Sequence, residues 1–171
     1  GQSILKALVK KADFLLENFR PGTMEKWGCS YEELQKINPR LIMIRVSGYG
    51  QTGPYSHRAG FGAIGEAMGG MRYVTGFPDR APARPNLSLG DALASLHGVV
   101  GAMMALHHRN VNGGTGQVVD VALYEAVFNM MEGMLPEYDL LGEIRERTGS
   151  GLTGIVPSNT YRSSDGQYIV I

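Results

Sequence analysis

Hydrophobic and polar positions divide this chain into helix-like and strand-like segments. Residues 4–11 carry apolar side chains at helical spacing, and residues 12–17 form a short apolar run typical of a buried strand. Residues 41–47 form a second, β-rich apolar run, and a long apolar helix is expected from Ala92 to His108. Because strands and helices alternate along the chain, we expect an α/β layer built on a parallel sheet.

Shorter signals place the remaining elements of this layer. Ser30 followed by Glu33 fits a capping box, which predicts a helix that continues through Lys36. Ligands of parallel sheets bind beyond the carboxyl ends of the strands, which is where residues 18–22 and 48–54 fall. Three further elements are expected from the pattern alone: a helix over 62–71, a strand over 117–121 and a helix over 124–134.

The C-terminal part of the chain indicates a second domain. Asp165-Gly166 lies between the strand-like residues 158–161 and 167–171, which is a hairpin signature. Both ends look cut, since no initiator methionine opens the chain and it stops inside an apolar strand, so we expect an internal piece of a longer protein. The expected organisation is part of a large α/β domain (1–134), a polar linker with a glycine loop (135–154) and the first hairpin of a smaller α+β domain (155–171).

Composition excludes several classes of protein. The 16 Lys and Arg residues balance 16 Asp and Glu residues, and this zero net charge gives no field that attracts nucleic acid or an anionic membrane. The single cysteine, Cys29, excludes an internal disulfide framework and fits a reducing compartment. No apolar run approaches the roughly 18 residues of a membrane span, and no signal-peptide pattern opens the chain. We therefore expect a cytoplasmic protein.

Residue spacing gives little support to metal, hydrolase or dinucleotide chemistry. The four histidines lack ligand spacing and the cysteine has no partner thiol, so no metal is expected. No Gly-x-Ser-x-Gly elbow is present. Residues 48–53 match the G-x-G-x-x-G spacing after a strand, but Pro54 and polar residues follow instead of a helix. This stretch is better explained as a loop that passes close to a ligand.

Asp91 stands where an extended stretch gives way to the long apolar helix. A carboxylate at that point lies in the first helical turn, where unpaired backbone N–H groups and the macrodipole favour negative charge. The position suits a nucleophile, and it suits an ordinary first-turn acid equally well.

The loop of residues 18–22, Asn-Phe-Arg-Pro-Gly, is the second candidate site. An amide, an aromatic ring and a guanidinium can hold a nucleotide-like ligand by hydrogen bonding, stacking and phosphate pairing. A Pro-Gly turn with a solvated Arg20 explains the same residues. Lys26 and Arg58 could add positive charge near this rim, although exposed basic residues are usually solvated.

Several motifs follow one another along the chain. They are Glu17-Asn-Phe-Arg-Pro-Gly22, Asn38-Pro-Arg-Leu-Ile42, Ser47-Gly-Tyr-Gly-Gln-Thr-Gly-Pro54, Gly90-Asp91, Ala105-Leu-His-His-Arg109, Gly114-Thr-Gly-Gln-Val-Val-Asp-Val-Ala-Leu123 and Ile155-Val-Pro-Ser158. In this order they resemble class III coenzyme A transferases, the family that contains formyl-CoA, carnitine and succinyl-CoA:dicarboxylate transferases. The resemblance runs from about Leu15 to the end of the chain. It implies a Rossmann-like large domain, coenzyme A carried as an acyl-CoA substrate, a carboxylic acid acceptor, no metal and an interlocked homodimer.

The resemblance also implies roles for individual residues. The family's catalytic aspartate falls on Asp91, and the glycine-containing residues 149–154 resemble the mobile loop that covers the site. Lys26 stands where relatives often have arginine, which keeps the charge but loses the bidentate fork. The implied CoA-contacting residues are Asn18, Phe19, Arg20, Lys26, Arg58, Ala59, Gly60 and Phe61.

Phe61 separates two activities of this superfamily. The related acyl-CoA racemases place a histidine 30 positions before the aspartate, which is the position of Phe61 here, and use the two residues as a proton-relay pair. Phenylalanine neither accepts nor donates a proton, so this type of racemase would lack half of its machinery. The residue favours a transferase.

The implied reaction moves CoA from an acyl-CoA donor, for which succinyl-CoA is the leading candidate, to a carboxylic acid. Asp91 would attack the thioester and pass through an aspartyl anhydride and an aspartyl–CoA thioester. An acyl-CoA racemase or epimerase with another base, and a catalytically incomplete fragment, are the alternatives. Arg72, Arg80 or Arg84 could pair an acceptor carboxylate, but solvated arginines are the preferred interpretation.

Overall fold

A three-stranded parallel sheet forms the centre of the molecule, which is described here from a computed structural model of residues 1–171. Its strands are β1 (Phe14–Glu17), β2 (Ile42–Ser47) and β3 (Val118–Ala122), in the order β1-β2-β3. Glu17 is paired with Arg45, and Ser47 with Ala122. The prediction of an α/β layer on a parallel sheet is confirmed.

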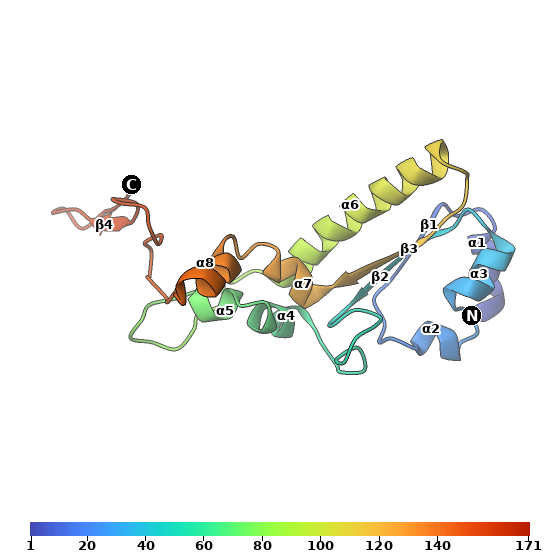
Figure 1. Cartoon of the computed structure of the whole chain (residues 1–171), viewed down its shortest axis with the longest axis horizontal. Helices are drawn as coiled ribbons and strands as arrows, with labels where there is room; N and C mark the ends of the chain where they lie inside the picture. The colour runs from blue at the N-terminus through green and yellow to red at the C-terminus, as the bar shows by residue number, and fades with distance from the viewer.

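Helices and a second, smaller sheet complete the fold (Figure 1). A two-stranded antiparallel hairpin ends the chain and projects away from the parallel sheet. The other elements are α1 (Gln2–Val9), α2 (Thr23–Lys26), α3 (Tyr31–Ile37), α4 (Gly62–Met68), α5 (Met71–Val74), α6 (Leu89–Val111), α7 (Leu123–Phe128), α8 (Met134–Leu141), β4 (Thr160–Arg162) and β5 (Tyr168–Val170).

Alternating side chains of β2 contribute to two separate hydrophobic clusters. Ile42 and Ile44 pack with residues of α6 and α7, whereas Met43 packs with residues of α1, α2 and α3. Successive side chains of a strand point to opposite faces, so the central strand is covered on both sides. This double burial explains why residues 41–47 read as an almost continuous apolar run.

The long helix α6 lies along the sheet through its small residues. A Cβ atom added at Gly98 would lie 3.6 Å from the Ile44 side chain, so the helix approaches the sheet closely. On length and composition α6 could also cross a bilayer, a property that it shares with core helices of soluble proteins. Its buried residues, Leu93 and Ala94 among them, face the cluster on the sheet.

Two polar side chains close the end of the sheet opposite the carboxyl ends of the strands. The Asn38 amide donates to the carbonyls of Val9 and Ala12, both at 2.9 Å, and so satisfies carbonyl groups at the end of α1. Arg109, which is buried near the end of α6, donates to the Arg40 carbonyl at 2.8 Å and to the Asp13 carboxylate at 2.7 Å. These bonds hold α1 and α6 to the strands that they cover.

Most predicted elements are present, and the structure corrects the bounds of two of them. The helix expected over 62–71 is interrupted because Gly70 has a φ of 93°, a left-handed conformation that ends α4 and starts α5. The helix expected over 124–134 ends at Phe128, and the expected linker contains α8 instead. The capping box is confirmed, since the Ser30 hydroxyl accepts from the Glu33 N–H at 3.4 Å.

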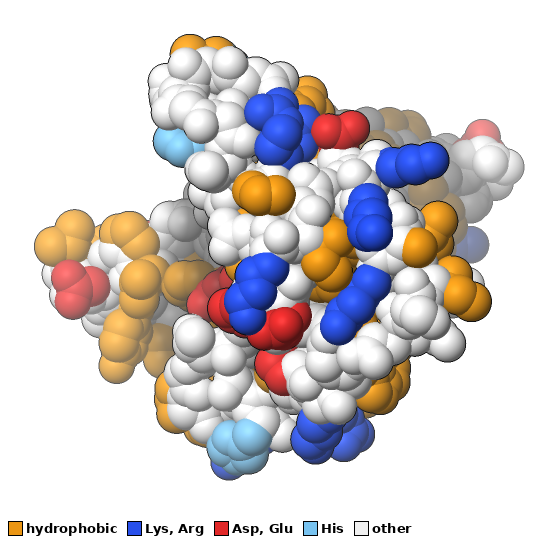
Figure 2. All heavy atoms as spheres, turned by 90° about the vertical axis from the view of Figure 1, so that its right-hand side faces the viewer, with side chains coloured by type: hydrophobic (Ala, Val, Ile, Leu, Met, Phe, Trp, Pro, Cys, Tyr) orange, Lys and Arg blue, Asp and Glu red, His pale blue; other side chains and the backbone are white.

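Charged side chains are spread over the surface in both signs. Figure 2 shows Lys and Arg side chains interspersed with acidic and hydrophobic ones on the face that carries the N-terminal helices. This distribution agrees with the zero net charge of the sequence.

We predict that Leu34→Ala destabilises the protein by about 2–5 kcal/mol, because Leu34 is fully buried between α1 and the sheet and its truncation leaves a cavity. Urea unfolding of the complete polypeptide measures the change. Leu140→Ala, at a side chain that is 79% exposed, is the matched control and should change the free energy of unfolding by less than about 0.5 kcal/mol. Equal effects of the two substitutions would contradict the assigned core.

Candidate functional site

The loops that carry the predicted site residues leave neighbouring strands at the same edge of the sheet. Residues 18–22 follow β1, and residues 48–61 follow β2. Because the strands are parallel, their carboxyl ends meet at one rim, where α/β proteins bind ligands. The first turn of α6 packs against α4, which begins directly after the second loop (Figure 1).

A buried ion-pair network fixes the first loop. Arg45 of β2 donates from Nε to Glu17 Oε1 at 2.6 Å and from Nη1 to Glu25 Oε1 at 2.8 Å. The other oxygen of Glu17 accepts from the Phe19 N–H at 2.8 Å. Burial by itself would raise the pKa of Glu25, but the hydrogen bond and charge of Arg45 outweigh it and lower the pKa. Arg45 therefore ties the end of β1 to α2.

The predicted ligand-binding side chains of this loop are exposed above that network. Asn18, Arg20 and Lys26 are exposed, and neither cation forms an ion pair within the protein. Phe19 is 44% exposed and meets Trp27 edge-on at a centroid distance of 5.0 Å. An apolar cavity of about 650 Å³ lies beside these two rings. The loop thus offers an aromatic surface and two free positive charges.

Two glycines bring the second loop back to the end of β2. A Cβ atom on Gly48 would lie 2.5 Å from the Gly60 Cα, so the two backbones touch at a distance that no other residue allows. Arg58 stacks on the Tyr55 ring, with 4.1 Å between the guanidinium carbon and the ring centroid. No helix forms between Gly48 and Phe61, which confirms that the dinucleotide fingerprint fails.

Ala59 and Phe61 are exposed on the last part of this loop, and Phe61 leads directly into Gly62 at the start of α4. Two polar side-chain atoms at the same rim, Ser47 Oγ and Gln51 Nε2, are buried without a partner inside the protein. Buried polar atoms in folded proteins nearly always have a hydrogen-bond partner. These two atoms have none within the protein, so a bound molecule or water can serve as their partner.

Asp91 lies in the first turn of α6 and is exposed. Its carboxylate makes no hydrogen bond to a backbone N–H of that turn, and it forms no ion pair with any residue. The carboxylate rests against the Cα of Gly62, where a Cβ atom would overlap it. Asp91 is therefore a first-turn acid that does not cap its own helix, and its oxygens are available for chemistry.

The preferred interpretation of Arg72 and Arg84 as solvated residues is wrong. Both pair with Glu66 of α4, with Nε–Oε2 distances of 2.9 Å and 3.3 Å, and the Glu66 side chain is completely buried. Arg80 does remain exposed, beside Asp79. The sequence carries no local signal for Glu66, because its partners come from α5 and from the segment before α6.

The structure brings the predicted site residues together in two groups. Gly60 and Phe61 lie next to Gly62 and so beside Asp91, whereas residues 18–26 lie at the end of the neighbouring strand. No hydrogen bond or ion pair joins the two groups. The glycine stretch 149–154 is tied elsewhere, through a bond from the Gly149 N–H to the Gly76 carbonyl at 2.9 Å.

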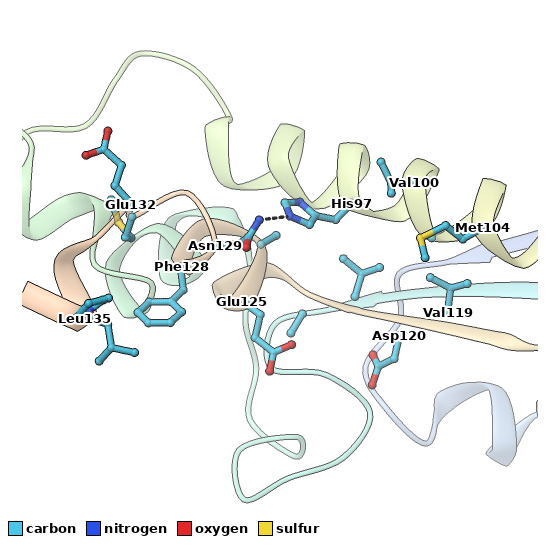
Figure 3. A pocket seen from close by; sticks show the side chains of 16 residues that line it. His97, Val100, Met104, Val119, Asp120, Glu125, Phe128, Asn129, Glu132 and Leu135 are labelled. Carbon is cyan, nitrogen blue, oxygen red and sulfur yellow. Dashed lines mark hydrogen bonds between the residues drawn. The ribbon is translucent and has the colours of Figure 1, made fainter. Parts of the chain in front are cut away.

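A second cavity, of about 670 Å³, lies between α6, β3 and α7 and contains none of the predicted site residues (Figure 3). Its charged lining is acidic, with Asp120, Glu125 and Glu132, which disfavours the phosphates of a nucleotide. His97 is engaged there in bonds to the Leu93 carbonyl and the Asn129 amide. These two bonds join α6 to the segment that follows α7, which gives His97 a structural role.

Comparison with known proteins places the chain in a family. The profile of CoA-transferase family III matches residues 1–171. The chain is 58% identical over 171 residues to the succinyl-CoA–D-citramalate CoA-transferase of Chloroflexus aurantiacus, and 50% identical over 172 residues to the alpha subunit of the succinyl-CoA–L-malate CoA-transferase of that organism. These alignments cover 100% of the chain but only 42% and 40% of the two relatives.

A crystal structure of a CAIB/BAIF family protein from Brucella suis has the same fold, with a TM-score of 0.91 and 36% sequence identity. The match covers 100% of this chain and 45% of that protein, so the chain spans less than half the length of its relatives. Because the family profile matches along its whole length, the chain belongs to CoA-transferase family III.

Proposed function

We propose that the complete protein transfers coenzyme A from an acyl-CoA donor to a carboxylic acid, with Asp91 as the nucleophile. The observation that carries this proposal is the state of the Asp91 carboxylate, which is exposed at a helix start and free of any internal partner. Attack on a thioester needs a carboxylate oxygen that no other group of the protein engages. Phe61, next to Gly62, supplies no second base for a proton relay.

The reaction proceeds by four exchanges at carbonyl carbons. An Asp91 oxygen attacks the donor thioester, which gives an aspartyl acyl anhydride and releases CoA thiolate. The thiolate attacks the aspartyl carbonyl and releases the donor acid, leaving CoA on Asp91 as a thioester. The acceptor carboxylate then attacks this thioester to form a second anhydride and free thiolate. Attack of the thiolate on the acceptor's carbonyl gives the new acyl-CoA and restores the Asp91 carboxylate.

These steps transfer no proton, so the protein must hold reactants and stabilise oxyanions. We assign the nucleotide part of CoA to the β1 loop, where the Phe19 ring can stack on a base and Arg20 and Lys26 can pair with phosphates. We assign a further part of CoA to residues 58–61, which lead into Gly62 and so to the Asp91 carboxylate. Backbone N–H groups at the start of α6 are suited to the oxyanions.

For the acceptor we propose a small dicarboxylic acid, and for the donor succinyl-CoA. The support is the names of the most similar relatives, which act on D-citramalate and L-malate with succinyl-CoA. We further propose that the complete protein works as a homodimer.

We predict that Asp91→Asn and Asp91→Ala abolish CoA transfer in the complete protein while acyl-CoA still binds, because the CoA loop lies on another strand. Mass spectrometry of the wild type after addition of succinyl-CoA should find a CoA adduct on Asp91 that hydroxylamine removes. The exposed Asp79→Asn is the matched control and should retain full activity. Transfer at the wild-type rate by Asp91→Ala would refute the assignment.

We predict that Gly62→Ala lowers kcat about 100-fold, because the new methyl group would occupy the place of the Asp91 carboxylate and displace it by about 1 Å. Gly98→Ala is the control, since its methyl group would make only an ordinary 3.6 Å contact with Ile44. Steady-state kinetics of the two variants measure the difference. Equal activities would mean that the position of the Asp91 carboxylate against Gly62 is unimportant for turnover.

We predict that Arg45→Lys raises the KM for acyl-CoA about tenfold and leaves kcat within about twofold. A lysine keeps one positive charge but cannot bridge Glu17 and Glu25 at once, so the CoA loop loses its anchor. Arg162→Lys, at an exposed position of the hairpin, should change neither constant. An unchanged KM in Arg45→Lys would show that the ion-pair network does not position the loop.

A further inference from the structure

The start of α6 lacks a cap from its own sequence. Ser88 occupies the N-cap position, but its side chain accepts no hydrogen bond from the first turn, and the Asp91 carboxylate accepts none either. Helix starts normally satisfy some of their free N–H groups with such a side chain, at a value of about 1 kcal/mol. The free N–H groups at the start of α6 therefore need a hydrogen-bond acceptor from another part of the fold.

Glu66 of α4 supplies that partner. Its Oε1 accepts a hydrogen bond from the Gly90 N–H at 3.3 Å, one residue before Asp91. A Cβ atom on Gly90 would lie 2.8 Å from the Gly62 carbonyl oxygen, so the two helices touch through backbone at this point. Gly62 and Glu66 are four residues apart and share one face of α4. That face contacts α6 at two consecutive residues, Gly90 through Glu66 and Asp91 through Gly62.

Two arginines hold the Glu66 carboxylate in its buried position. Arg72 comes from α5 and Arg84 from the segment before α6, with side chains that are 25% and 42% exposed. Burial would raise the pKa of Glu66, but bonds from Arg72 and the Gly90 N–H and the charge of Arg84 lower it. Arg72, Arg84 and Glu66 together carry two positive charges and one negative charge, so the three side chains add no net negative charge near Asp91.

We propose that Glu66 is a positioning residue for Asp91, because it caps the first turn of α6 at Gly90 and thereby fixes where the nucleophile stands. The inference rests on the proposed function of Asp91. It goes beyond that function because the buried Glu66 carboxylate bonds to Arg72, Arg84 and the Gly90 N–H, and so acts through the backbone of α6.

Two conservative variants of the complete protein separate capping from simple charge pairing. Glu66→Gln keeps the length of the side chain and an oxygen that accepts from the Gly90 N–H, but it loses the charge that pairs with the arginines. Glu66→Asp keeps the charge but is one methylene shorter, so it withdraws the oxygen from Gly90. Glu33→Gln, in an exposed pair with Lys36, is the matched control.

Positioning predicts that Glu66→Asp lowers kcat about 30- to 100-fold, leaves the KM for succinyl-CoA within about twofold, and reduces the Asp91–CoA adduct found by mass spectrometry. Glu66→Gln should keep kcat within about fivefold of the wild type, and Glu33→Gln should match the wild type. Thermal unfolding of each variant identifies any loss of activity that reflects loss of fold.

The reverse order of activities, with Glu66→Asp more active than Glu66→Gln, would overturn the proposal, because charge pairing would then be what matters. A wild-type kcat in both variants would overturn it as well. So would an equal loss of kcat in both variants that is accompanied by lower thermal stability and a higher KM. Asp91→Ala run beside them separates this failure from that of the proposed function. If Asp91→Ala is inactive while Glu66→Asp is normal, only the positioning role is lost.

Discussion

The contact between α4 and the first turn of α6 determines where the Asp91 carboxylate lies, and the rest of the candidate site is arranged around it. Glycine at positions 62 and 90 lets the two backbones touch, and the Asp91 carboxylate comes to rest on the Cα of Gly62. Any larger residue at Gly62 would occupy the space of that carboxylate. Close packing of this kind restricts where the carboxylate can lie, and the carboxylate still remains exposed at the surface.

The same contact explains how the Asp91 carboxylate can remain without a partner. A side chain at a helix start often bonds to the N–H groups of its own helix, which would engage the oxygens that attack in the proposed reaction. In this chain the N–H of Gly90 is bonded by Glu66, and Glu66 in turn is neutralised by Arg72 and Arg84. The stabilisation of the helix start is thereby separated from the nucleophilic role that we propose for Asp91.

A second buried network organises the neighbouring loop on a similar principle. Arg45 joins Glu17 and Glu25, and Glu17 holds the Phe19 N–H, so the exposed aromatic and basic side chains stand on a fixed backbone. Breaking such a buried pair usually costs about 3–5 kcal/mol, because one charge is left without a partner. Both networks lie just inside the rim of the sheet, where they hold the backbone that carries the candidate site residues.

The sequence by itself determined the layered α/β architecture, the parallel sheet, the C-terminal hairpin and the family. Those features depend on periodicity and on local turn chemistry, which a single segment carries within itself. It also made Asp91 and the exposed loop residues candidates for the site, because a helix start, Pro-Gly turns and the family motifs are local; their roles stay predictions. Only the tertiary structure decided that Arg72 and Arg84 are engaged, that Arg45 anchors the loop, and that Glu66 caps a helix from outside. Their partners lie 6 to 28 residues away along the chain, and the pairing arises when packing brings separate elements together.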